Sequence, residues 1–168
     1  MTFKEKIKPF IPMFPRVKYG FYCGNNSLSD IFILIKYIYK NSSKNNIIEK
    51  FEKLFCKLSK SKFSISFGSG RMALFAILKT MRVKKGDEII LPAFTCSVVP
   101  NAIIYTSAKP IYVDINFKDF NLNTSLIEKK ITKKTVAIYA QHTFGIKCNM
   151  SALNRIAKKY KLKIIEDN

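Results

Sequence analysis

The chain has 168 residues, of which 48% are hydrophobic and 24% are charged, and its formal net charge is +19. This length suits about one domain, and the composition is typical of a folded globular protein and excludes a disordered one. The charge alone would suggest nucleic acid as a partner, but nearly all the positive residues are lysines spread along the whole chain, whereas nucleic-acid sites favour arginine. We therefore expect no nucleic-acid partner.

The first 46 residues predict an arm and one helix. Three prolines and two glycines within residues 1–26 indicate irregular backbone. A helix is expected over 27–39 and a polar linker over 41–46. The apolar run within that helix is too short to cross a bilayer, so we expect no membrane span.

A second helix should begin at Ile47, because apolar residues recur at helical spacing from there to Leu58. After it, the pattern changes to alternating strands and helices. Strands are expected at 63–67, 88–91, 110–115, 135–140 and 163–166, and helices at 70–81, after Ser97, at 125–131 and at 151–160. Ser125 and Glu128 have the spacing of a capping box, and Asn149 can cap the last helix.

Strands that alternate with helices over short connections predict an α/β fold with a mostly parallel sheet. Such sheets bind ligands at the carboxyl ends of their strands. Five places lie there in the expected order: Gly68–Gly70, the segment PAFTCS after Leu91, Asp114, the segment QHTFG after Ala140, and Asp167.

Taken one at a time, these places leave alternatives open. The stretch GSGRMAL is either a tight turn or a phosphate loop at a helix N-terminus. Asp167, at the end of an apolar strand, either caps a turn or binds something cationic, and His142 is either structural or functional. The four cysteines lack CxxC spacing and His142 is the only histidine, so no metal site is expected. The cysteines are interpreted as reduced, in a cytoplasmic protein without a secretory leader.

Together, these stretches resemble the DegT/DnrJ/EryC1/StrS family of pyridoxal-phosphate-dependent sugar aminotransferases. The motifs that carry the resemblance lie in the family's order over about residues 47–168: KFEKLF, SGRMAL, GDEIILPAFTCSVVPNAI, AKPIYVDINFKDFNLN, HTFG and KLKIIEDN. The resemblance implies the large domain of the aspartate-aminotransferase-like fold (fold type I), with residues 1–46 before it. Each motif is weak by itself, but six in order and at the right spacing are specific.

The resemblance also implies roles for individual residues. Pyridoxal phosphate is the implied cofactor, and its phosphate would be held by Ser69, Gly70, Arg71 and Met72. Asp167 would pair with the pyridine nitrogen and keep it protonated, while Cys96 and His142 would also contact the cofactor.

This sequence departs from the family at several positions. Arg71 stands where the family often has threonine, Cys96 where many members have the aromatic residue that stacks on the cofactor, and Asn168 where alanine is usual. The family's Schiff-base lysine lies downstream of the aspartate, and the chain has one residue after Asp167. We therefore expect this chain to be truncated and inactive alone, and the strand at 63–67 to lack neighbours.

The function that the resemblance implies is amino transfer, from glutamate, to a nucleotide-linked keto sugar for surface polysaccharide synthesis. The complete protein would be a homodimer. Two alternatives stay open: a dehydratase-type relative without the lysine, and a basic binding module without catalysis.

Overall fold

The computed structural model describes residues 31–33, 35–36 and 44–168, and the chain divides into two compact units at residues 65 and 66. The arm expected over residues 1–26 lies outside the described residues. Of the helix expected over 27–39, residues 31–33 and 35–36 are described and are helical. Among the described residues, no helix has both the length and the apolar character needed to cross a membrane.

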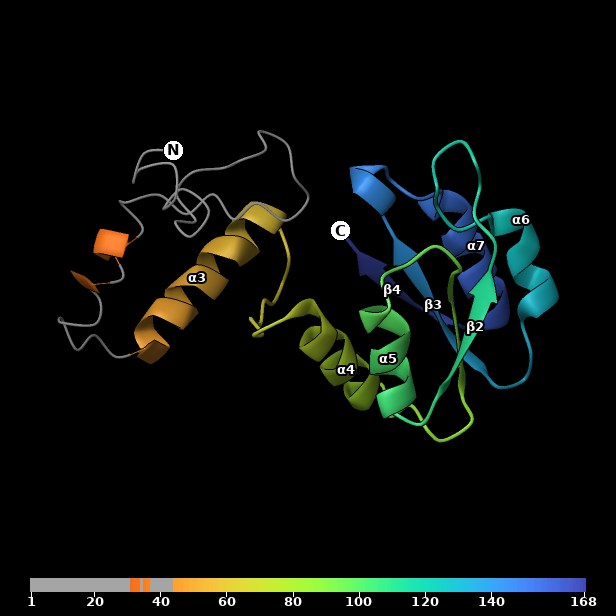
Figure 1. The fold of residues 1–168 in the computed structure, drawn as a ribbon, viewed down its shortest axis with the longest axis horizontal. Helices are drawn as coiled ribbons and strands as arrows, with labels where there is room; N and C mark the ends of the chain where they lie inside the picture. Colours follow the sequence, from red (N-terminus) through yellow and green to blue (C-terminus); the bar gives the residue numbers. More distant parts are fainter. Residues whose placement is uncertain (1–30, 34, 37–43) are drawn as a thin grey trace, which may run out of the picture. The chain divides into compact units, whose positions relative to one another are not determined.

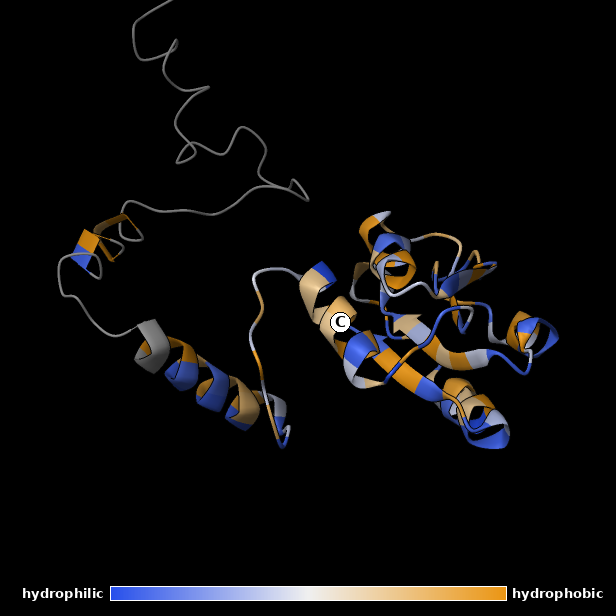
Figure 2. Cartoon of the chain, turned by 90° about the horizontal axis from the view of Figure 1, so that it is seen from below, coloured by the Kyte–Doolittle hydropathy of each residue, from blue (hydrophilic) through white to orange (hydrophobic). Residues whose placement is uncertain are grey.

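The main helix of the first unit is α3, Lys44–Ser59. Its hydrophobic and hydrophilic residues lie on different sides of the helix axis, which confirms the amphipathic pattern (Figure 2). The linker expected over 41–46 is wrong for Lys44–Asn46, which form the first turn of the helix. An exposed ion pair, Lys53 with Glu49 at 2.5 Å, joins successive turns on the polar side.

The second unit is a parallel sheet between two layers of helices (Figure 1). Its strands are β1 (Glu88–Pro92), β2 (Lys109–Val113), β3 (Thr135–Gln141) and β4 (Lys163–Asp167), in the order β2-β1-β3-β4. Its helices are α4 (Gly70–Thr80), α5 (Val98–Tyr105), α6 (Thr124–Ile127) and α7 (Met150–Tyr160), with short 3-10 turns η1 (Glu128–Lys130) and η2 (Thr143–Gly145). Every strand pair is parallel, as the alternating pattern predicts.

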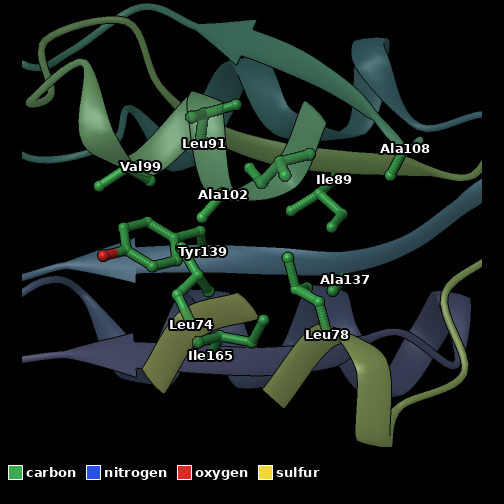
Figure 3. Close-up of a cluster of buried hydrophobic side chains, with 11 residues drawn as sticks. Leu74, Leu78, Ile89, Leu91, Val99, Ala102, Ala108, Ala137, Tyr139 and Ile165 are labelled. Carbon is green, nitrogen blue, oxygen red and sulfur yellow. The ribbon is translucent and has the colours of Figure 1, made fainter. Parts of the chain in front are cut away.

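Each face of the sheet has its own hydrophobic core. On one face α4 and α5 cover a cluster that includes Leu74, Leu78 and Tyr139 (Figure 3). On the other face α6 and α7 cover a cluster that includes Leu153 and Cys148. Because side chains alternate along a strand, both faces of the central strands are apolar, which is why these strands are continuous hydrophobic runs in the sequence.

Residues 63–67, expected to form a strand, do not form one. A strand needs a neighbour for its backbone N–H and C=O groups, and no strand of the described chain pairs with this segment. The alternating side chains Phe63, Ile65 and Phe67 are 76%, 72% and 43% exposed. Alternation alone does not make a strand, because a strand also needs a neighbouring strand to pair with.

The capping box at Ser125 is also wrong. The residue that caps α6 is Asn123, whose Oδ1 accepts hydrogen bonds from the backbone N–H of Ser125 at 3.2 Å and from its hydroxyl at 2.7 Å. Glu128 does not reach back to the cap, because its carboxylate accepts from Lys159 at 2.8 Å and from Tyr160 at 2.9 Å on α7. The cap expected at Asn149 is confirmed, since its Oδ1 accepts from the backbone N–H of Ala152 at 3.1 Å.

Candidate functional site

The candidate site lies at the carboxyl edge of the sheet, on the face that α4 and α5 cover. Figure 3 shows Leu74 beside Tyr139 near the arrowheads of the strands, and Leu78, one turn further along α4, beside Ala137. The N-terminus of α4 therefore points to the edge where the strands end. The loop after β1 and the end of β4 meet the same edge, as the parallel topology predicts.

The start of α4 is a helix N-terminus, where the first backbone N–H groups lack the carbonyl partners that a preceding turn would supply. Ser69 is the N-cap, and its hydroxyl accepts from the backbone N–H of Met72 at 3.3 Å. Apart from its chain neighbours and the backbone of its own helix, no described atom lies within 4 Å of a Cβ built on Gly70, so the backbone there is open to a ligand. The exposed guanidinium of Arg71 has no polar partner among the residues that the structure describes. These groups suit an anion.

Asp167 is the last residue of β4, and three contacts define its position. Its Oδ2 accepts a hydrogen bond of 2.5 Å from the hydroxyl of Tyr139, and its backbone carbonyl accepts from the backbone N–H of His142 at 2.8 Å. In the strand register it lies opposite Gln141. The carboxylate is thus held by β3 and is only partly buried, which leaves it accessible to a ligand.

Tyr139 was not singled out in the sequence, although it is the nearest partner of Asp167. Its side chain is 5% exposed. Burial above all, and then the hydrogen bond to Asp167, raise the pKa of Tyr139 well above its ordinary value of 10.0, and the Cys96 thiol makes a smaller contribution in the same direction. Cys96 is exposed in the loop after β1. The one signal in the sequence is that Tyr139 carries a hydroxyl group within a mostly apolar strand.

The backbone of His142 is hydrogen-bonded to that of Asp167, but the ring of His142 lies on the other face of the sheet. Its Nε2 lies 2.8 Å from Oε1 of Glu166, and its Nδ1 accepts from the backbone N–H of Cys148 at 3.1 Å. Because Nδ1 is an acceptor, the neutral ring carries its proton on Nε2 and donates it to Glu166. The ring is 8% exposed and therefore has a structural environment, while its backbone N–H supports Asp167.

A buried polar network joins the loops that follow three strands. The hydroxyl of Thr95 donates to Oε1 of Gln141 at 2.6 Å. Asn121, which is 2% exposed, donates to the carbonyl of Ile146 at 2.9 Å and accepts from the backbone N–H of Thr143 at the same distance. These contacts hold the carboxyl edge in one shape. They were not predicted, because they join residues from 22 to 46 positions apart.

Asp114, also expected at this edge, uses its carboxylate locally. Its Oδ1 accepts from the backbone N–H of Ile115 at 2.8 Å, which is a turn contact. No group of three or more His, Cys, Asp or Glu side chains within the described residues has the arrangement of a metal site.

The model of the DegT/DnrJ/EryC1/StrS aminotransferase family matches residues 39–168. The chain belongs to this family. Its described second unit therefore has the fold of the pyridoxal-phosphate-dependent, aspartate-aminotransferase-like (fold type I) enzymes, in the part that carries the parallel sheet.

Two curated relatives illustrate the membership. GDP-perosamine synthase of Escherichia coli O157:H7 is 39% identical over 126 residues, which are 75% of this chain and 35% of that protein. The dTDP-3-amino-3,6-dideoxy-alpha-D-galactopyranose transaminase of Aneurinibacillus thermoaerophilus is 37% identical over 120 residues, 71% of this chain and 33% of that protein. The chain spans about a third of the length of these family members.

Among solved structures, NtdA from Bacillus subtilis with bound cofactor PMP matches with a TM-score of 0.79 and 32% identity, over 86% of this chain and 34% of that one. A GDP-4-keto-6-deoxymannose-3-dehydratase with a trapped PLP-glutamate geminal diamine matches with a TM-score of 0.67 and 28% identity, over 72% of this chain and 33% of that one. The fold of the present chain is thus shared by an aminotransferase and by a dehydratase of known structure.

Proposed function

We propose that this chain forms the pyridoxal-phosphate-binding part of an aminotransferase that acts on a nucleotide-linked keto sugar, with glutamate as the amino donor. The observation that carries the proposal is the carboxylate of Asp167, held at the carboxyl edge of the sheet where the open N-terminus of α4 also points. Pyridoxal phosphate has an anion at one end and a basic ring nitrogen at the other. The N-terminus of α4 suits the phosphate anion, and the carboxylate of Asp167 suits the protonated ring nitrogen.

The phosphate would be bound at the start of α4. Ser69, Gly70, Arg71 and Met72 supply a hydroxyl, backbone N–H groups and a guanidinium, and the helix dipole adds to their attraction. Cys96 would lie against the ring, since it is exposed in the loop after β1, at the carboxyl edge of the sheet.

Asp167 would hold a proton on the ring nitrogen. Its Oδ2 is occupied by the hydroxyl of Tyr139, so Oδ1 is the oxygen available to the ring N–H. Pyridoxal phosphate, when bound, supplies the electron sink that amino transfer needs, and a protonated ring nitrogen makes it a better one. The ring of His142 does not contact the carboxylate of Asp167. We propose that His142 supports the site through its backbone N–H, which donates to the carbonyl of Asp167.

The substrate class comes from the relatives, two of which are named for nucleotide-linked amino sugars. Because the chain spans about a third of those proteins, the transfer reaction, the amino donor and a homodimeric assembly are proposed for the whole protein. A dehydratase function has weaker support, since the solved dehydratase is 28% identical and the curated synthase is 39% identical.

A cofactor titration tests the proposal. Pyridoxal phosphate added to the chain should bind saturably, with a change in its absorbance spectrum, and pyridoxal without the phosphate should bind more weakly. Arg71→Ala should weaken binding about tenfold, the usual size for loss of one charged hydrogen bond.

The matched control is Arg82→Ala, which removes a second exposed arginine just beyond the opposite end of α4. That variant should bind as the wild type does. Equal effects of the two arginine variants, or no saturable binding to the wild-type chain, would rule the proposal out.

A further inference from the structure

Tyr139 connects the core of the domain to the candidate site. Its ring packs in the cluster under α4 and α5 with Leu74 and Ile165, and its hydroxyl points out of this cluster toward the ends of the strands (Figure 3). At that end the hydroxyl donates to Oδ2 of Asp167 at 2.5 Å. A hydrogen bond from a hydroxyl to a carboxylate at this distance belongs to the short, charge-assisted class.

The sheet register explains why this tyrosine reaches this carboxylate. Tyr139 pairs with Ile165 and Gln141 pairs with Asp167, so the two partners are diagonal neighbours on one face of a parallel pair. A long aromatic side chain spans such a diagonal, whereas a short polar one does not. Since the ring is fixed by packing on its sides, the position of the hydroxyl is set by the core and not by the loop.

The contact has a consequence for the geometry of the carboxylate. With Oδ2 engaged, Asp167 cannot turn freely about its last bond, and Oδ1 is presented in one direction. The buried phenol stays protonated across the neutral range, so it remains a donor to the carboxylate. Gln141, a second polar side chain at this end of β3, is already engaged by Thr95 and Thr143.

We propose that Tyr139 is a positioning residue for Asp167: its hydroxyl holds one carboxylate oxygen so that the other meets the protonated ring nitrogen of pyridoxal phosphate. This inference rests on the proposed function, and adds to it a residue that acts only through Asp167. Under this proposal, a residue of the hydrophobic core helps to set the orientation of the cofactor.

The test is a double-mutant cycle on cofactor binding. Tyr139→Phe removes the hydroxyl and retains the ring, so the core packing is kept. This variant should bind pyridoxal phosphate about tenfold more weakly than the wild type, because one charge-assisted hydrogen bond to the carboxylate is lost. Tyr112→Phe is the matched control, since it removes a hydroxyl from an exposed residue of β2 and should leave binding unchanged.

The decisive variant combines Tyr139→Phe with Asp167→Asn. If Tyr139 acts through Asp167, the tenfold effect of Tyr139→Phe should vanish when Asp167→Asn is already present. A purely structural role would make the two effects multiply, and that result would overturn the proposal. The thermal unfolding midpoint of each variant shows that the folded chain is being compared.

A second measurement reports the ring nitrogen itself. Pyridoxal phosphate labelled with nitrogen-15 should show a protonated ring nitrogen on the wild-type chain and a less protonated one on Tyr139→Phe. Cofactor binding with the same affinity and the same nitrogen signal in both proteins would overturn the positioning role and leave the proposed function standing. Failure of the wild-type chain to bind the cofactor would overturn both.

Discussion

The two sides of the carboxyl edge use adjacent acidic residues differently. Glu166 and Asp167 follow each other in β4, so their side chains leave the sheet on opposite faces. On the α7 face, Glu166 meets the ring of His142, which also accepts the backbone N–H of Cys148. On the α4 face, Asp167 meets Tyr139 and lies at the edge to which the open helix N-terminus points.

The difference teaches which groups are available for chemistry. His142 has both ring nitrogens engaged within the protein, so its side chain closes the α7 side. Asp167 has one oxygen engaged and Arg71 has none of its donors engaged within the described residues, so the α4 side is open. We infer that the α7 side supports the edge and that the α4 side binds the cofactor, and the following experiments test that distinction.

The largest expected effect is on stability, from the buried hydrogen bonds of Asn121 that hold the loops at the carboxyl edge. Asn121→Ala should lower the free energy of unfolding by about 2–4 kcal/mol, because it leaves the N–H of Thr143 and the carbonyl of Ile146 without partners in a buried place. Urea denaturation measures this change. Asn154→Ala, an exposed asparagine of α7, is the control and should change stability little. Similar midpoints for the two variants would show that the network is not a support.

The next effect separates the adjacent carboxylates. Asp167→Asn should weaken the binding of pyridoxal phosphate by about tenfold to a hundredfold, since a charged partner of the ring nitrogen becomes neutral. Glu166→Gln changes the same kind of group on the other face and should weaken binding by less than about threefold. Fluorescence titration of both variants measures the two constants. A greater loss in Glu166→Gln would reverse the assignment of the faces.

A pH effect is expected on the α7 side from Cys148. Burial above all, with the negative charges of Asp119 and Glu166, raises the pKa of this thiol from 9.0 to about 11. A raised pKa of an acid favours the protonated form in the folded state, so its stabilisation is complete below pH 9.0 and is lost as the pH rises through about 11.

The part of that loss that falls between pH 8 and pH 10.5 is up to about 2 kcal/mol. Urea midpoints at pH 8 and pH 10.5 measure it, and Cys148→Ala should remove this part of the alkaline loss. Cys56→Ala, which removes a thiol of α3, retains Cys148 and should keep the loss. An equally steep alkaline loss in Cys148→Ala would contradict the assignment.

The smallest effect compares the two helix caps. Ser69→Ala and Asn149→Ala each remove a side-chain acceptor at a helix N-terminus, and each should cost about 1 kcal/mol of stability. Only Ser69→Ala should also weaken pyridoxal phosphate binding, by about threefold, because the cofactor phosphate is proposed to bind at the N-terminus of α4. Thermal melts and cofactor titrations of the pair give both numbers. Equal cofactor affinities would remove Ser69 from the site.

Much of the fold could be predicted because it depends on local patterns. The order of strands and helices in the second unit, and their parallel arrangement, follow from hydrophobic periodicity and short connections. The cap at Asn149 follows from the same local rules, whereas the cap at Asn123 was missed because Ser125 and Glu128 matched a stronger motif. The strand expected at 63–67 failed because pairing is not a local property.

The sequence by itself determined the family and the carboxyl-edge location of Ser69, Cys96 and Asp167, since the order of strands and helices and their short parallel connections follow from local hydrophobic periodicity. Only the tertiary structure decided which partner each carboxylate meets. That choice depends on the register of β4 against β3, which places Tyr139 on the diagonal from Asp167, and on the loop that brings Cys148 to the ring of His142. Register is set by packing of the two cores over the whole sheet, and no short stretch of the sequence contains it.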